Sequence, residues 1–263
     1  MTDTIRYTRE GALARLTLNR PHVLNAMGFE MGARWRDLAH EVTADPTVGA
    51  VLIDAAGPAF CAGGDVLAMA STTGAGGADI TAMAGVIHEG IRIFVESDKP
   101  VVAAVQGAVA GGGLGLMLTA DYVVAAGGAR FVSRYANIGL TPDLGVSTLL
   151  PAAIGQTRAL RMLLQDLTID AETALDWGLI AEVADDPGRR ATEVAAFWLD
   201  GATAAFGQAK RLIRAGAQRA FAENLDDEAR TIGASFDTPE AHARVAAFAA
   251  ASARRQSTTE ETP

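Results

Sequence analysis

Two glycine-rich segments are the first residues in this 263-residue chain whose types and spacing could do chemistry. Residues 60–65 read FCAGGD and residues 107–113 read GAVAGGG, and each segment follows an apolar run. Glycine leaves the backbone N–H groups of a turn unobstructed, and two N–H groups aimed at one point stabilise a carbonyl oxygen that gains negative charge. The two segments therefore predict an oxyanion hole, with tight packing of the turns as the alternative interpretation.

Other common catalytic patterns are missing from the sequence. The chain has no G-x-G-x-x-G stretch, no Gly-Lys dipeptide and no G-x-S-x-G elbow. These omissions disfavour a dinucleotide site, a P-loop and a serine-hydrolase elbow. His88-Glu89 is followed by arginine at position 92, where a zinc protease needs its second histidine. With four histidines and one cysteine, the sequence predicts no metal site.

The charge and composition limit the partners and the location that we expect. Lys and Arg number 22 against 31 Asp and Glu, which makes the formal net charge −9 and argues against nucleic-acid binding. An anionic small ligand stays compatible, because a local pocket can be basic while the total charge is negative. Cys61 is the only cysteine and the first residues lack a secretory pattern, so we expect a cytoplasmic protein. Residues 101–120 carry no charge, but their five glycines favour a buried strand, a turn and a helix over a membrane span.

The elements that must position the two turns follow from hydrophobic periodicity. Alternating residues at 5–8 and 14–19 predict a hairpin, and the apolar spacing over 27–44 predicts an amphipathic helix. Two rounds of strand, glycine turn and helix follow. Strands are expected at 48–53, 101–105, 121–125 and near Phe131, and helices at 80–97 and 114–120. This rhythm predicts an α/β fold with parallel strands whose turns share one edge.

The remaining segments organise the rest of the chain. The composition of residues 71–77 predicts a mobile loop. From residue 157 onward the sequence is mostly helical, with helices around 160–164 and 171–177, and residues 256–263 predict a frayed tail.

Six segments follow one another in a characteristic order: NRPHVLNA at 19–26, the two glycine segments, Ala120-Asp121, NIGLTPD at 137–143 and ALDWGLI at 174–180. In this order they make the chain resemble the enoyl-CoA hydratase/isomerase, or crotonase, family, to about residue 250. It implies a ββα spiral core over residues 1–200. It also implies a C-terminal helical region over 201–263 that packs on neighbouring subunits, in a homotrimer or a hexamer of two trimers.

The resemblance further implies an acyl-CoA substrate and no cofactor other than the coenzyme A that the substrate carries. The N–H groups of Gly64 and Gly112 would hold the thioester carbonyl. Asp65 and Asp121 also have structural interpretations, as a cap or ion-pair partners. In relatives, an aromatic and a basic residue of the last helix reach a neighbour's coenzyme A, which gives Phe248 and Arg254 a candidate role beside that of a solvated basic face. The residues expected to line the substrate site are His22, Val23, Leu24, Ala26, Ala62, Asp65, Val66, His88, Tyr135 and Pro142.

This sequence departs from the family pattern where hydratases keep two glutamates. Those positions are Gly115 and Tyr135 here, and neither can act as a carboxylate base at neutral pH. Asp143, in GLTPD, stands where the isomerases of the family keep their acid. Moving a double bond is a 1,3 proton shift that one carboxylate and an oxyanion hole can perform, so we expect an enoyl-CoA isomerase. The alternative interpretation of Asp143 is a turn residue after Pro142.

Three other functions stay open from the sequence. Dehalogenases of the family use an aspartate at the position of Asp143 as a nucleophile, with a histidine where His88 lies and a tryptophan where this chain has Tyr135. His88 is also compatible with an exposed or capping residue of a helix. A hydratase or thioester hydrolase could recruit water through Asp143 and Tyr135. A non-catalytic acyl-CoA-binding protein is the third alternative.

Overall fold

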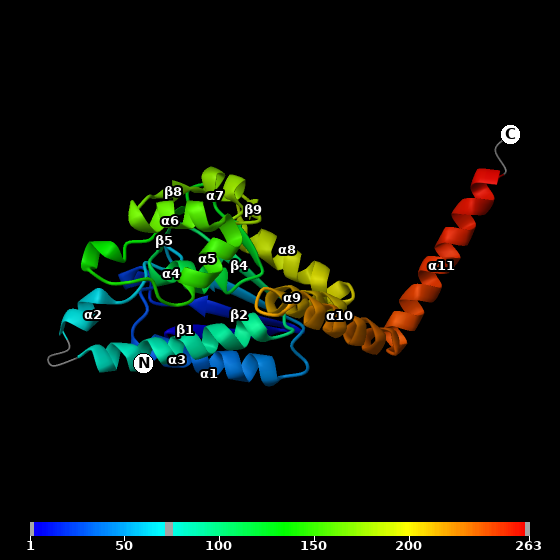
Figure 1. Cartoon of the computed structure of the whole chain (residues 1–263), viewed down its shortest axis with the longest axis horizontal. Helices are drawn as coiled ribbons and strands as arrows, with labels where there is room; N and C mark the ends of the chain where they lie inside the picture. Colours follow the sequence, from blue (N-terminus) through cyan, green and yellow to red (C-terminus); the bar gives the residue numbers. More distant parts are fainter. Residues whose placement is uncertain (1–2, 72–75, 261–263) are drawn as a thin grey trace.

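A six-stranded sheet forms the centre of the molecule (Figure 1). The computed structural model describes residues 3–71 and 76–260. The first two strands pair antiparallel and the others run parallel, so the predicted hairpin and parallel sheet are confirmed. The strand order is β1 (Ile5–Glu10), β2 (Leu13–Leu18), β3 (Ala50–Ala55), β4 (Val101–Val105), β6 (Tyr122–Ala125) and β9 (Glu182–Val183).

A second sheet consists of three short strands, two of which follow strands β4 and β6 of the first sheet along the chain. It contains β5 (Ala108–Ala110), β7 (Arg130–Val132) and β8 (Ile169–Asp170). A bridge between Cys61 and Val109 joins the first glycine turn to this sheet, and a bridge between Met27 and Gly64 joins the same turn to the start of α1. Both glycine turns therefore lie at one end of the parallel strands, as the sequence predicts.

Both faces of the central strands are covered. In β4, Val101, Ala103 and Val105 belong to the large core, whereas Val102 and Ala104 pack in a smaller cluster under α8 (Pro187–Asp200). This alternation is the two-residue period of a strand that is buried on both sides. On the large-core side, α1 (Phe29–Ala44) and α3 (Gly77–Glu96) lie against each other, and the rings of Trp35 and Phe94 are 5.1 Å apart.

Shorter helices complete the body of the molecule around the glycine turns. The uncharged stretch 101–120 consists of β4, β5 and α4, which confirms the predicted strand, turn and helix. No helix in the described part of the chain is long and apolar enough to cross a membrane, and a cytoplasmic location stays a prediction. The helices are η1 (Pro21–Val23), α2 (Val66–Ser71), α4 (Gly112–Leu118), η2 (Ala136–Ile138), α5 (Val146–Ile154), α6 (Gln156–Leu164) and α7 (Ala171–Trp177).

The C-terminal region is helical and ends far from the sheet. It contains α9 (Thr203–Gly216), α10 (Phe221–Phe236) and α11 (Pro239–Glu260). Figure 1 shows α11 pointing away from the rest of the chain. None of the described side chains of α10 is buried. Helix α8 ends at Asp200 and the first of these helices begins at Thr203. A division of the chain into two regions at residue 200 stays a prediction.

Some expectations from the sequence need correction. The tail expected over 256–263 is helical through Glu260, because no proline or glycine interrupts α11 before that residue, and residues 261–263 lie outside the described residues. Helix α5 was not predicted, since Pro151 lies inside it, whereas α8 falls within the region that the sequence predicts to be mostly helical. Residues 72–75 of the expected mobile loop also lie outside the described residues, and Gly77 already begins α3.

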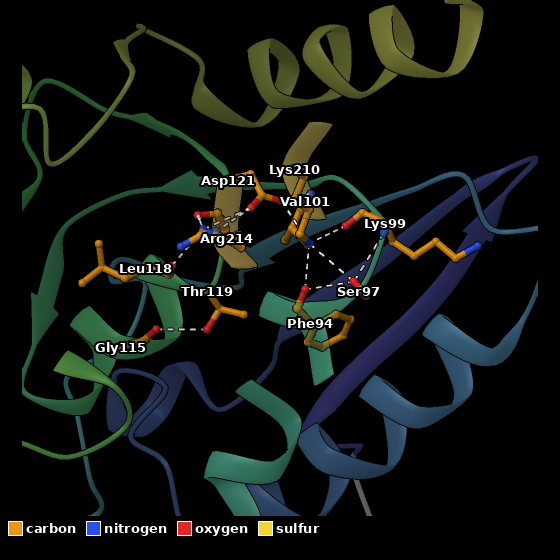
Figure 2. A network of polar contacts seen from close by, with 11 residues as sticks. Phe94, Ser97, Lys99, Val101, Gly115, Leu118, Thr119, Asp121, Lys210 and Arg214 are labelled. Atoms are coloured by element: carbon orange, nitrogen blue, oxygen red, sulfur yellow. Dashed lines mark hydrogen bonds and ion pairs between the residues drawn. The ribbon is translucent and has the colours of Figure 1, made fainter. Parts of the chain in front are cut away.

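A buried ionic network fixes α9 to the sheet (Figure 2). Lys210 Nζ lies 3.1 Å from the Asp121 carboxylate and donates to the carbonyls of Phe94 and Lys99 at 2.7 and 2.6 Å. Arg214 pairs with the other oxygen of Asp121 at 3.1 Å and donates to Ala120 O at 2.9 Å. These contacts hold the first helix of the C-terminal region at the chain segment that follows α4, and they bear out the structural interpretation of Asp121.

Candidate active site

A cavity of about 240 Å³ lies between α3 and the two glycine turns. Most of its wall is apolar, and Asp143 contributes the one carboxylate among the described residues that line it. Both glycine turns, Tyr135 and Asp143 therefore face one space. The lining consists of Met27, Ala62, Gly63, Gly64, Val66, Met69, Ile80, Met83, Ala84, Ile87, Gly111, Gly112, Arg134, Tyr135, Asn137, Ile138, Leu140, Asp143 and Leu144.

The two glycine turns lie in contact because glycine lets their backbones approach. Gly63 has φ +101°, and a Cβ there would lie 2.9 Å from Ala110 O and 3.5 Å from Gly112 N. A Cβ on Gly113 would lie 2.3 Å from Cys61 O, closer than real side chains come. Any larger residue at these positions would therefore push the turns apart.

Two backbone N–H groups are available at this junction. Gly112 is the first residue of α4, so its N–H group has no partner inside the helix. Within the described part of the chain, the N–H groups of Gly64 and Gly112 donate to no acceptor. Both residues line the cavity. Such donors can bind a carbonyl oxygen and stabilise it when it becomes an oxyanion.

Asp143 lies next to this pair of amides. Its Oδ1 would be 3.8 Å from a Cβ placed on Gly112, and it accepts a hydrogen bond from the Tyr135 hydroxyl at 2.5 Å. Asp143 Oδ2 accepts no hydrogen bond from the residues that the structure describes. One oxygen of the carboxylate is thus held by a phenol, and the other keeps its lone pairs for a proton.

Tyr135 acts as a donor throughout the physiological pH range. Burial raises the pKa of its phenol far above the ordinary value, and the adjacent Asp143 charge and hydrogen bond raise it further. A phenolate next to the carboxylate would place two negative charges in a buried site, which the geometry disfavours. Tyr135 therefore orients the carboxylate and does not itself serve as a base.

The segment after Pro142 fills the space where hydratases of the family carry a glutamate. A Cβ on Gly115 would lie 2.1 Å from Leu144 O, and a Cβ on Gly112 would lie 2.6 Å from Leu144 Cδ1. Leu144 is 3% exposed. The absence of a side chain at position 115 is thus what lets the segment with Asp143 lie against α4.

Asp65 has a structural role beside the first turn. Its Oδ2 pairs with Arg20 at 2.9 Å, and its Oδ1 accepts from Ala68 N at 3.0 Å, at the start of α2. Burial alone would raise the pKa of Asp65, but the hydrogen bond from Ala68 and the Arg20 charge outweigh burial and lower it. Both structural interpretations of this residue, cap and ion-pair partner, are confirmed.

The segment expected to bind coenzyme A lies directly beside the first turn. Ala62 N donates to Leu24 O at 3.0 Å, and Met27 N donates to Gly63 O at 2.7 Å. Ala62, Val66 and Tyr135 line the cavity, whereas the other seven expected contacts lie outside its lining, so their role in binding stays a prediction. Outside the lining are His22, Val23, Leu24, Ala26, Asp65, His88 and Pro142.

Several residues of the site were missed in the sequence. Buried Asn25 accepts from Arg20 N at 2.7 Å and donates to the carbonyls of Ala56 and Ala59, so it ties the segment before α1 to the first turn. Ile80, Met83, Ala84 and Ile87 form one wall of the cavity. Their i, i+3, i+4, i+7 spacing is the signal that could have found them, but the same spacing is also typical of a helix that faces a core.

Cys61 lies within the first glycine segment and has an unreactive thiol. It is fully buried, and burial raises the pKa of its thiol to about 11, well above the value of an ordinary cysteine. A thiol with this pKa is not a nucleophile at neutral pH. This result agrees with the sequence, which predicts a small buried residue here.

Comparisons with known proteins agree with this geometry. A family model described as enoyl-CoA hydratase/isomerase matches residues 8–254. The probable enoyl-CoA hydratase EchA14 of Mycobacterium tuberculosis is 37% identical over 195 residues, which are 74% of this chain and 75% of that protein. The 1,2-epoxyphenylacetyl-CoA isomerase of Escherichia coli is 37% identical over 67% of this chain and 68% of its own length.

A solved structure extends the likeness to nearly the whole fold. The crystal structure of a putative enoyl-CoA hydratase/isomerase from Mycobacterium abscessus superposes with a TM-score of 0.86 at 34% identity and covers 94% of this chain and 96% of that one. The match of the family model spans both glycine turns, Tyr135 and Asp143. The chain belongs to the enoyl-CoA hydratase/isomerase, or crotonase, family of acyl-CoA enzymes.

Proposed function

We propose that this protein is an enoyl-CoA isomerase that moves a carbon–carbon double bond by a 1,3 proton shift. The observation that carries the proposal is the pairing of a single carboxylate, Asp143, with the free N–H groups of Gly64 and Gly112 around one cavity. A hydratase shares its work between two acids. Here the backbone of Leu144 occupies the space that a side chain at position 115 would need.

The proposed reaction uses Asp143 first as a base and then as an acid. With a 3-enoyl-CoA, Asp143 Oδ2 takes a proton from C2, and the electron pair moves through the thioester carbonyl onto its oxygen. The N–H groups of Gly64 and Gly112 stabilise the resulting dienolate. Asp143 then returns the proton to C4, the double bond comes to lie between C2 and C3, and the carboxylate is regenerated. No redox step occurs, so the proposal includes no cofactor beyond the coenzyme A of the substrate.

The similarity to the E. coli protein is consistent with this reaction class. That relative is named as an isomerase of a coenzyme A thioester, and its 37% identity to this chain equals that of the protein named as a probable hydratase. Names alone therefore do not separate the two activities. The cavity has one carboxylate, Asp143, among its described lining residues, and this favours the isomerase.

Heavy water distinguishes the candidate activities. The protein is incubated with 3-enoyl-CoA and 2-enoyl-CoA in D₂O, and the products are analysed by mass spectrometry and NMR. Isomerisation puts deuterium at C2 or C4 without added oxygen. Formation of 3-hydroxyacyl-CoA would show a hydratase instead, free coenzyme A would show a hydrolase, and tight binding without turnover would show a non-catalytic binder.

Substitution of the proposed base tests the mechanism. Asp143→Asn keeps the shape of the side chain but cannot take a proton, so we expect kcat to fall about 10²–10⁴-fold. The control is Asp176→Asn, an aspartate whose side chain is 76% exposed on α7. Full isomerase activity in Asp143→Asn would exclude Asp143 as the base.

We also propose that the chain assembles into a homotrimer or a pair of trimers through its C-terminal helices. Large apolar side chains of α10 and α11 are exposed in the single chain, among them Phe221 (79%), Ile232 (73%) and Phe248 (72%). Exposed apolar surface of this extent marks an interaction site. Light scattering coupled to gel filtration should give three or six times the 27.2 kDa of one chain, and a mass of one chain would contradict the assembly.

A further inference from the structure

His88 contacts the segment that carries Asp143 without lining the cavity. Its Nε2 accepts a hydrogen bond from the backbone N–H of Leu144 at 3.0 Å, and the two residues lie 56 positions apart in the chain. Leu144 directly follows Asp143. His88 is thus hydrogen-bonded to the residue that follows Asp143, but it does not line the cavity.

The turn that this bond supports has an unusual backbone. Leu144 has φ +50° and Gly145 has φ +79°, so two consecutive residues lie in the left-handed region. A branched residue such as leucine rarely adopts this conformation and persists there only where its surroundings enforce it. Within the described chain, Leu144 N–H donates to His88, and Asp143 O accepts from Val146 N at 3.0 Å.

Only one protonation state of His88 can make this contact. A backbone N–H is a donor, so Nε2 must carry a lone pair, and the single proton of the neutral ring lies on Nδ1. When both nitrogens are protonated, the ring is a donor at both positions and would point an N–H group at the N–H group of Leu144. The hydrogen bond therefore exists with neutral His88 and is lost with the imidazolium.

We infer that His88 is a positioning residue, which in its neutral form holds the Leu144 backbone so that the Asp143 carboxylate stays beside the Gly64 and Gly112 amides. The inference rests on the proposed function, in which Asp143 is the base. Loss of the contact releases the left-handed turn and moves the carboxylate. Misplacement of a catalytic group by about 1 Å can cost on the order of 10²-fold in rate.

Solvent can reach the His88 side chain. The side chain is exposed on α3. On the same helix, Glu89 is paired with His40 of α1 at 2.8 Å, and Arg92 lies one turn further on. On the facing segment, the titratable groups are Asp143 and the Tyr135 phenol bonded to it. Histidine is the side chain whose charge normally changes between about pH 5 and 8.

Two substitutions at position 88 distinguish the loss of the hydrogen bond from the mere change of a residue on α3. In His88→Gln, the side-chain oxygen lies near the place of Nε2 and accepts at every pH, whereas His88→Leu offers no acceptor. We expect kcat of the wild type to fall about tenfold more than that of His88→Gln between pH 7.5 and 5.5. His88→Leu should lose about 10–10²-fold in kcat at every pH, with KM changed less than about threefold because position 88 lies outside the cavity lining. Arg92→Gln, on the same helix, is the matched control.

A measurement without turnover keeps the inference testable if His88→Leu fails to fold. The amide ¹H–¹⁵N signal of Leu144 should shift with pH in the wild type and stay constant in His88→Gln over the same range. A wild-type Leu144 signal that does not titrate, or a folded His88→Leu with wild-type kcat, would overturn the inference. In either case a nearly inactive Asp143→Asn would leave the proposed function intact, whereas a fully active Asp143→Asn would refute that function itself.

Discussion

Two aspartates of this molecule, Asp121 and Asp143, differ in how their carboxylate oxygens are used. Asp121 accepts from Val101 N at 2.9 Å and pairs with Lys210 and Arg214 at 3.1 Å, so both of its oxygens are in use (Figure 2). Asp143 lines the cavity, with one oxygen bound to the Tyr135 hydroxyl and the other accepting no hydrogen bond from the described residues. The comparison shows that one carboxylate is fully occupied by ion pairs and a hydrogen bond, whereas the other keeps an oxygen without a partner among the described residues.

The two networks also differ in what they hold together. Lys210 has a side chain that is 4% exposed, and its ammonium group is surrounded by two backbone carbonyls and the Asp121 carboxylate. Burial lowers the pKa of Lys210, and the Asp121 charge opposes that effect. This network joins α9 to the end of α4, whose first residue supplies an amide of the site. One end of α4 is thus held by the ionic network, and the other end carries the N–H group of Gly112, which donates to no acceptor in the described part of the chain.

The same substitution at both aspartates should produce the largest contrast. Asp121→Asn leaves the Lys210 charge buried without its counter-charge, so we expect the free energy of unfolding to fall by about 3–5 kcal/mol. Asp143→Asn keeps an acceptor for Tyr135 and should cost less than about 1 kcal/mol. Urea denaturation measures both values. Equal losses of stability would mean that Asp143 belongs to a structural network like that of Asp121.

A methyl group on Gly115 tests how the segment with Asp143 is placed. In Gly115→Ala, the new Cβ would collide with Leu144 O, so we expect a loss of about 1–3 kcal/mol of stability and a lower kcat. Gly233→Ala in α10 is the control, because a Cβ there meets no atom within 4 Å. Wild-type activity in Gly115→Ala would show that the position of Asp143 does not depend on this contact.

The phenol of Tyr135 should make stability depend on pH in alkaline solution. Its pKa in the folded protein is raised by burial and by Asp143, whereas in the unfolded chain it lies near ~10. Above that pH the unfolded chain binds fewer protons than the folded one, so stability falls as pH rises, by at most about 1.4 kcal/mol per pH unit for this group. Tyr135→Phe should reduce that slope in denaturation curves between pH 9.5 and 11. An unchanged slope would contradict the placement of the phenol against the carboxylate.

The last test concerns the reactivity of Cys61, which we expect to play a structural role only. With its thiol buried and its pKa raised to about 11, we expect a thiol reagent at pH 8 to react at least about 10²-fold more slowly with the folded than with the unfolded protein. The rate in guanidinium provides the reference. Fast reaction of the folded protein would show that the first glycine turn opens, and would contradict a fixed position of the Gly64 N–H group.

The sequence predicts the local parts of the fold because their causes are local. Alternation of apolar residues predicts β1 and β2, and the uncharged run with five glycines predicts β4, a turn and α4. The order of short motifs is enough to identify the family. Helix α5 escapes prediction because Pro151 lies inside it, and the tail was wrongly expected to fray because polar residues are compatible with both a helix and a coil.

By itself, then, the sequence determined the strand and helix pattern, the two glycine turns, the absence of a carboxylate at position 115 and the presence of Asp143. Only the tertiary structure decided that Tyr135 binds Asp143, that Leu144 fills the space at Gly115 and that His88 holds Leu144. Contacts of this kind join segments up to 56 residues apart. A hydrogen bond needs its two atoms within about 3 Å of each other, and the packing of α3 and α4 into one core sets that distance.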